Sequence, residues 1–399
     1  MNYDSIDGAG FPLGFKTRAG RTPGTLTGSA PARDVFRVEA RTMGGHQKEI
    51  VVTEGEGGDA WRMVSDEGAN LKGTDLAPFP LAFFNAGLHA DFVHRALHLA
   101  RAQGVPLEID SIHLDNQYYF NGSFFDGTGE GSAEPVTVNV TARSSASEAR
   151  ILALLEAALA ASPAHALMAL PQRDTFALYV NGRRCPVVRV AASGQPDQVD
   201  PYKAHGAAPA PIKDALPTVE PIVRVPPDPA QGPARVIAGA GRISIQVRGA
   251  CTVDASGLVT IQVTPAWRGA SYRFICDAGS PGGRAPSGLA NIVAGIAFCY
   301  MTQFTRYIEH RKHNVRAIRF VQNLPFTLAG NARDGGLRGG LEPVDTHVFL
   351  HAEDTDEIMQ NLLQVAENTC YLHAALRSAI PSRVALQFKS APTPQAVTA

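Results

Sequence analysis

Two cysteines in the second half of this 399-residue chain are the residues whose type and placement could support chemistry. Cys299 falls midway along one long apolar segment, and Cys370 falls midway along another. A thiolate is a strong nucleophile, and two thiols that can meet are oxidised to a disulfide. A lone core cysteine more often packs as a small hydrophobic residue. The presence of one thiol on each of two core segments therefore marks the candidate site.

The other cysteines, Cys185, Cys251 and Cys276, bring the total to an odd number in a large chain. Disulfide scaffolds usually occur in small secreted domains with an even number of cysteines. The chain starts with Met1-Asn2-Tyr3-Asp4 and lacks the basic and apolar stretches of a secretory signal. We therefore expect reduced thiols and a cytoplasmic protein.

The segments that carry the two candidate cysteines belong to a pattern that occurs twice. In each half, alternating strands precede a long apolar helix with a proline near its start, at residues 77–103 and 285–313. Further strands follow, and a second helix closes the unit at residues 147–169 and 355–379. We predict an α+β fold with two copies of a β-β-helix-β-β-helix-β unit.

The first copy carries no thiol at the two candidate positions. At an offset of 210 residues Cys299 corresponds to His89, and at an offset of 208 residues Cys370 corresponds to Ser162. Any thiol chemistry is therefore expected in the second copy alone.

A segment rich in proline, alanine and glycine, at residues 191–233, separates the two copies. Proline removes backbone donors and favours extended geometry, which is typical of a linker on the surface. We therefore expect domains at residues 31–190 and 234–390. Residues 1–30 should form an irregular segment, and residues 391–399 a frayed tail.

Composition excludes several classes of function. With 36 Lys and Arg against 37 Asp and Glu, the chain lacks the basic excess of a nucleic-acid-binding protein. The uncharged stretch at residues 285–305 holds too many polar side chains for a membrane span and indicates a core helix. No P-loop and no Gly-x-Ser-x-Gly elbow occurs. His94 and His98 have a helical zinc spacing but no obvious third ligand, so we expect neither metal nor cofactor.

Three segments of the second copy carry a resemblance to a known family. They are Val247-Arg248-Gly249 with Asp254 to Leu258, Pro286 through Ala297-Phe298-Cys299-Tyr300-Met301, and Ala366 through Cys370-Tyr371-Leu372-His373. In the first copy the matching segments are Pro78-Phe79-Pro80 and Ala96 to Glu108. In order and spacing the chain resembles a tandem fusion of two OsmC-like/organic hydroperoxide resistance (Ohr) proteins.

This resemblance implies two OsmC-like domains, each with antiparallel strands wrapped around two central helices, arranged as an intrachain pseudo-dimer. It also implies a cysteine-based peroxidase that reduces organic hydroperoxides in oxidative-stress defence. Cys299 would be the peroxidatic residue, and Cys370 would resolve its sulfenic acid to a disulfide that a dithiol or lipoyl-type reductant reopens. Arg248 would activate the thiolate, with Arg242 and Arg284 as substitutes.

One family feature is missing. Members usually carry a glutamate after the helix-opening proline, where it orients the arginine, but Ser287 and Gly288 follow Pro286 here. Asp277 or a residue of the first copy could take its place. The alternative function is a non-catalytic OsmC-like protein that binds a small apolar ligand or a partner, with both cysteines structural. The resemblance also allows two such chains to pair as a homodimer.

Overall fold

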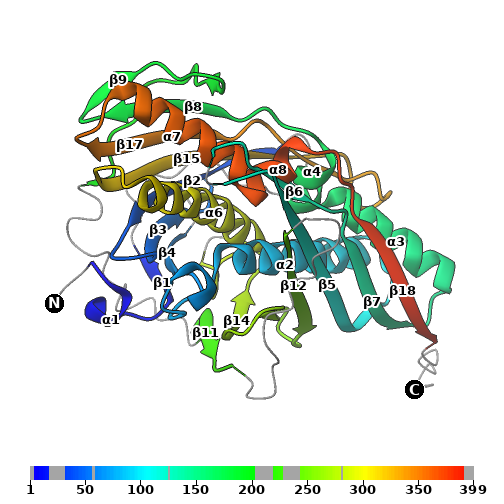
Figure 1. Ribbon diagram of the computed structural model, residues 1–399. Coiled ribbons are helices and arrows are strands. Elements are labelled where there is room, and N and C mark those ends of the chain that lie inside the picture. The colour runs from blue at the N-terminus through cyan, green and yellow to red at the C-terminus, as the bar shows by residue number, and fades with distance from the viewer. Residues whose placement is uncertain are drawn as a thin grey trace, which may run out of the picture.

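The computed structural model describes residues 4–17, 32–55, 59–124, 126–202, 219–227, 243–279 and 282–390. Two long helices, α2 (Pro80–Gln103) and α6 (Gly288–Arg311), lie side by side at the centre (Figure 1). α6 packs on one β-sheet, α2 packs on a second sheet, and the two helices pack on each other. The fold is therefore α+β, as predicted, with the helices between two sheets.

The remaining elements follow in chain order. In the first half they are α1 (Ile6–Ala9), β1 (Gly14–Thr17), β2 (Ala32–Thr42), β3 (Lys48–Thr53), β4 (Ala60–Ser65), η1 (Ala69–Leu71), then after α2 β5 (Glu108–Asn121), β6 (Glu130–Ala133), β7 (Thr137–Ser144), α3 (Glu148–Ala161), α4 (Pro163–Ala169), β8 (Thr175–Val180), β9 (Arg183–Cys185) and β10 (Ala191–Ala192). In the second half they are β11 (Ile222–Val225), β12 (Ile243–Val253), β13 (Val259–Pro265), β14 (Ser271–Cys276), then after α6 β15 (Val315–Ala329), β16 (Arg338–Leu341), β17 (Asp345–Ala352), α7 (Asp356–Thr369), α8 (Tyr371–Arg377) and β18 (Arg383–Ser390).

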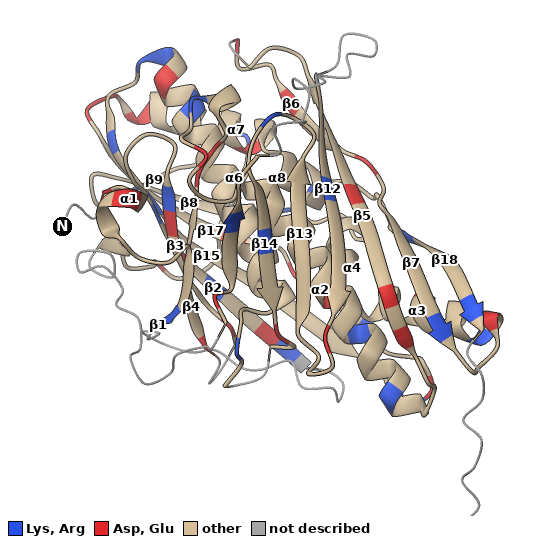
Figure 2. Cartoon of the chain, turned by 90° about the horizontal axis from the view of Figure 1, so that it is seen from below, with Lys and Arg blue, Asp and Glu red and all other residues tan. Residues whose placement is uncertain are grey.

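The two sheets have related strand orders. One runs β1-β4-β3-β2-β15-β17-β8-β10, and the other runs β11-β14-β13-β12-β5-β7-β18. Figure 2 looks onto the second sheet, with the helices behind it. Each sheet joins a three-stranded meander from one half of the chain to a pair of strands from the other half. The predicted domains at residues 31–190 and 234–390 are therefore not spatially separate, because the two ranges share both sheets and one continuous core.

From α2 onward, the elements of the two halves keep a constant spacing. α2 and α6 each have 24 residues and start 208 positions apart. The same offset relates α3 to α7, α4 to α8, and β7 to β17. The strands before the central helices, β2 to β4, repeat as β12 to β14 at an offset of 211 residues. The backbone therefore repeats its order of elements, with a shift of three residues ahead of the central helices.

Local sequence explains where the central helices begin and end. Pro80 opens α2 at a position where no amide donor is needed, and Gly104 closes it in the left-handed conformation at φ 62°. The Ser287 side chain caps α6 by accepting a hydrogen bond from the amide of Ala290, at 3.0 Å. A Cβ atom on Gly288 would lie 2.6 Å from the backbone nitrogen of Asp91, so this glycine permits the close, antiparallel packing of α6 on α2.

Several predictions need correction. The second helix of each half is two helices, because Ser162 and Cys370 adopt extended backbone, with ψ 112° and 120°. In the first half, Pro163 after the break starts α4, and the Ser162 side chain caps it. Cys370 therefore lies at a helix junction and not midway along a helix.

The predicted irregular segment at residues 1–30 includes α1 and β1, and β1 pairs with β4. The predicted linker at residues 191–233 includes β10 and β11, which extend the two sheets. Residues 203–218, 228–242 and 391–399 lie outside the described part of the chain. Within the described part, α6 and, as one bent unit, α3 with α4 could cross a membrane by length and composition alone. The most apolar stretch of α6 is 94% buried inside the protein, as core helices are.

Candidate functional site

A cavity of about 470 Å³ opens beside the second half of α6. One face of α6 supplies its polar wall, with Cys299, Thr302, Gln303 and Arg306 spaced as neighbours on a helix surface. The opposite walls are mainly apolar and aromatic and come from both halves of the chain: Leu71, Phe79, Leu81, Phe120, Phe124, Ile245, Trp267 and Tyr371. We call this space the Cys299 cavity. Its size and lining suit a small organic molecule with a large apolar part.

The structure brings Cys299 and Cys370 together. The two side chains are neighbours that affect each other electrostatically, and both thiols are free. Burial first, and then the contact with Cys299, raise the pKa of the Cys370 thiol well above its usual value. Cys299 lines the cavity with 3% of its surface exposed, whereas Cys370 is completely buried behind it. A molecule in the cavity can therefore reach Cys299 but not Cys370.

Arg306 supplies a cation to this cavity. It lies seven residues after Cys299, two helical turns along the same face of α6. Its guanidinium donates to Gln303 Oε1 at 3.0 Å and lies 4.3 Å from the ring centre of Phe124. These contacts hold the guanidinium beside the apolar wall, where a fixed positive charge acts more strongly than in bulk water.

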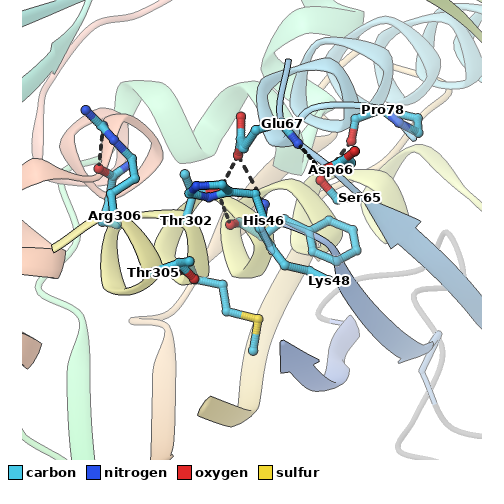
Figure 3. A network of polar contacts seen from close by, with 12 residues as sticks. His46, Lys48, Ser65, Asp66, Glu67, Pro78, Thr302, Thr305 and Arg306 are labelled. Atoms are coloured by element: carbon cyan, nitrogen blue, oxygen red, sulfur yellow. Dashed lines mark hydrogen bonds and ion pairs between the residues drawn. The ribbon is translucent and has the colours of Figure 1, made fainter. Parts of the chain in front are cut away.

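A carboxylate from the first half, Glu67, also lines the cavity. Figure 3 shows its contacts with Thr302 and Lys48. Glu67 accepts hydrogen bonds from Thr302 Oγ1 at 2.5 Å and from the fully buried Lys48 ammonium at 3.1 Å. Thr302 stands one turn after Cys299 on α6, so its bond to Glu67 fixes the carboxylate near the thiol. Glu67 is therefore a carboxylate of this cavity whose charge partner is Lys48 and not an arginine.

Tyr118 on β5 borders the thiol pair from the first half. Its ring lies 5.7 Å from that of Tyr371, the residue after Cys370. Its hydroxyl is buried and has no hydrogen-bond partner among the described residues. Burial first, then the proximity of Cys299 and Cys370, raise the pKa of Tyr118. A buried hydroxyl without a partner is uncommon and leaves a donor available for a group formed at the sulfurs.

Arg248 does not lie at the thiol pair. Along β12, Val247 and Gly249 face inward, so strand alternation turns Arg248 to the solvent. There its guanidinium lies 3.5 Å from Gln246 Oε1. The structure therefore does not bring Arg248 to the Cys299 cavity, and the arginine that lines the cavity is Arg306.

The proposed substitutes for Arg248 do not reach the pair either. Arg284 donates to Ser256 and lies 3.5 Å from Asp277, which places both charged residues away from the Cys299 cavity. Arg242 falls outside the described residues. Arg306, Glu67 and Tyr118 were not found from the sequence. Of these three, only Arg306 could have been found from the sequence, because its spacing from Cys299 puts both residues on one face of the helix.

The remaining cysteines lie in apolar surroundings. Burial raises the pKa of Cys251 to about 12 and raises those of Cys276 and Cys185 as well. Burial of this kind disfavours the thiolate, so these residues are typical structural cysteines. No group of three or more His, Cys, Asp or Glu side chains in the described ranges could hold a metal ion.

The first half contains a second cavity at the matching place. At the structural offset of 208 residues, Cys299 corresponds to Asp91 and not to His89 as predicted. Cys370 corresponds to Ser162, and Ser162 Oγ donates to the Asp91 carboxylate at 2.5 Å. The two positions that meet as thiols in one half therefore meet as a hydroxyl and a carboxylate in the other.

Comparison with known proteins identifies part of the chain. Residues 280–385 match the family model described as OsmC-like protein, so the second half contains an OsmC-like domain. A solved structure, an OsmC-like hydroperoxide resistance protein from Jannaschia sp. CCS1, is similar at 21% sequence identity over 32% of this chain and 81% of that chain, with a TM-score of 0.21. No curated protein matches the chain.

Proposed function

We propose that this protein reduces organic hydroperoxides through the Cys299–Cys370 pair. The observation that carries the proposal is the contact between two free thiols of unequal access, one at the wall of an apolar cavity and the other buried behind it. The OsmC-like domain at residues 280–385 agrees with hydroperoxide resistance at the level of the family.

The first step takes place at Cys299. Its thiolate attacks the terminal oxygen of the hydroperoxide, the O–O bond breaks, and the alkoxide takes a proton and leaves as the alcohol. Cys299 becomes a sulfenic acid. Arg306 stabilises the thiolate and the negative charge on the leaving oxygen, and Glu67 accepts the thiol proton. The apolar walls bind the organic part of the substrate.

The second step takes place at Cys370. A raised pKa keeps Cys370 protonated while Cys299 reacts, and one cause of that rise is the neighbouring Cys299. Oxidation of Cys299 to a neutral sulfenic acid removes this repulsion, so Cys370 can attack the sulfenic sulfur. A disulfide forms and one water leaves. A dithiol or lipoyl-type reductant then returns both thiols, which suits the reducing cytoplasm.

The first half, in this proposal, is a degenerate OsmC-like domain that pairs with the second half as an intrachain pseudo-dimer. The related strand orders and the common offset of 208 residues from α2 onward support it. The first half has no thiol at the candidate positions but contributes Glu67, Phe79, Phe120 and Tyr118 to the surroundings of the thiol pair.

A thiol count tests the function. Reduced protein is treated with one equivalent of cumene hydroperoxide, and its free thiols are counted by mass before and after. The count should fall from five to three, with a peptide linking Cys299 to Cys370. Cys299→Ser should keep its remaining thiols, whereas Cys370→Ser should stop at a sulfenic acid on Cys299. Cys185→Ser is the control and should still form the link.

The alternative, a binding protein with two structural cysteines, predicts a different result. Thiol counts that stay constant for minutes in the wild type, or that fall equally in Cys299→Ser, would refute the peroxidase.

A further inference from the structure

The second cavity has a volume of about 510 Å³ and lies at the opposite end of the α2–α6 pair. We call it the Asp91 cavity. Asp91, His94, Arg95 and His98 of α2 line it, and each stands 208 positions before a residue that lines the Cys299 cavity. Ser287, Gly288 and Leu289 at the start of α6 line it too, as Phe79, Pro80 and Leu81 at the start of α2 line the other. The fold therefore presents two cavities at equivalent positions.

The chemistry of the two cavities differs. The Cys299 cavity is mainly apolar, whereas charged and imidazole side chains dominate the Asp91 cavity: Asp34, Asp91, His94, Arg95, His98 and Arg101. Phe36 and Leu289 provide an apolar wall. The place of the thiol pair is taken by Asp91 and Ser162, which cannot be oxidised by a peroxide. A molecule in this cavity would be bound and not reduced.

The buried carboxylate of Asp91 finds its hydrogen-bond donors and its charge partner within the protein. Asp91 is 4% exposed. It accepts hydrogen bonds from Ser162 Oγ at 2.5 Å and from the Ala164 amide at 3.2 Å, and its other oxygen lies 3.3 Å from Arg95 Nε. A buried charge that is paired and hydrogen-bonded in this way needs no external cation.

Two basic side chains of the cavity, His98 and Arg101, have no acidic partner among the described residues. Arg101 Nε donates a hydrogen bond to the carbonyl of Leu97 in its own helix. No carboxylate among the described residues pairs with Arg101. His98 stands between Arg95 and Arg101 on the same face of α2. Burial first, and then these two arginines, lower the pKa of His98. The two carboxylates of the cavity, Asp34 and Asp91, are buried, whereas His98 and Arg101 are exposed. The exposed side chains that an incoming ligand meets first are therefore basic.

We propose that the Asp91 cavity is a binding site for a small organic anion. The anionic group lies against Arg95, His98 and Arg101, and the body of the molecule lies against Phe36 and Leu289. A guanidinium presents paired donors that fit a carboxylate or a phosphate ester. The volume is that of a site for an organic molecule and exceeds what a bare ion needs. This site stands whether or not the thiol pair reduces peroxides.

Calorimetric titration with three probes of similar shape tests the site: benzoate, phenyl phosphate and the uncharged benzamide. We expect the two anions to bind with a dissociation constant of about 1 mM or tighter, and benzamide to bind at least about tenfold more weakly. The tighter of the two anions identifies the preferred acidic group. Arg101→Gln should weaken anion binding at least about tenfold, and Arg101→Lys should weaken it less.

Two control variants test whether anion binding is specific to the Asp91 cavity, and Arg95 is left intact in both because it pairs with the buried Asp91. Arg173→Gln removes an exposed arginine that lines neither cavity and should leave binding unchanged. Arg306→Gln removes the arginine of the Cys299 cavity and should also leave it unchanged. No saturable binding of either anion up to about 10 mM, equal binding of benzamide, or equal affinity in a folded Arg101→Gln variant would each overturn the proposal.

Discussion

The Cys299 and Asp91 cavities occupy the same place in two copies of one arrangement of elements, yet they differ in nearly every polar side chain. Each is built from the start of one central helix and the second half of the other. In one, two thiols meet. In the other, Ser162 and Asp91 meet within the same helix geometry. The difference teaches that the backbone fixes where two side chains touch, whereas a few substitutions decide whether the contact can be oxidised.

The comparison also explains why the two contacts have different structural roles. Asp91 is a buried charge on which a hydroxyl, an amide and an arginine converge. Cys299 is neutral when protonated and has open space on one side. Removal of Asp91 leaves a hydroxyl, an amide and an arginine without that partner, whereas removal of the Cys299 sulfur leaves no charged group unpaired.

The largest expected effect comes from Asp91→Ala. Loss of one member of a buried charged pair should lower the free energy of unfolding by about 3 kcal/mol. Cys299→Ala deletes one atom at a cavity wall and should cost about 1 kcal/mol. Urea denaturation of both variants measures the difference. Equal destabilisation by the two substitutions would show that the Asp91–Ser162 contact contributes no more to stability than the Cys299–Cys370 contact does.

The second comparison replaces, one at a time, the basic residues at equivalent positions of the two cavities, Arg306 and His98. Arg306→Gln removes the cation beside Cys299 and should slow oxidation by cumene hydroperoxide about a hundredfold. His98→Gln, its counterpart in the other cavity, should leave that rate unchanged. Stopped-flow kinetics with the reduced protein measures both. A similar rate for the Arg306 variant and the wild type would exclude Arg306 as the activating group.

The smallest effect on stability should come from Tyr118→Phe. The equivalent residue of β15 is Phe326, so the change makes the two positions identical. Because the Tyr118 hydroxyl has no partner among the described residues, its loss should leave the free energy of unfolding within about 0.5 kcal/mol of the wild type or raise it slightly. A clear loss of stability would show that the hydroxyl has a structural partner.

Much of the fold could be predicted from the sequence. Both central helices were predicted to within about one turn of their observed ends. The prediction rested on the proline near the start of each helix and on the apolar stretch that follows it. The breaks at Ser162 and Cys370 were missed. Pro163 signalled the first break, whereas Tyr371 after Cys370 gives no local sign of the second.

The candidate site could be predicted only in part. The structure brings Cys299 and Cys370 together, but Arg248 faces solvent, because strand alternation and not a loop sets its direction. Glu67 and Tyr118 reach the site through pairing between the halves, which local patterns cannot reveal. The offset of 210 residues assigned His89 to the Cys299 position, although the neighbouring elements already required 208.

The mixed origin of both sheets has a consequence for biosynthesis. β2 is synthesised long before β15, the strand with which it pairs. In the same way, β7 is synthesised long before its partner β18, the last described strand. The nascent first half must therefore keep its sheet edges and the apolar face of α2 unpaired until the second half has been synthesised. Such late, non-local pairing slows folding and favours aggregation of incomplete chains. This protein should depend on chaperones during synthesis more than a chain of equal length whose domains close one after the other.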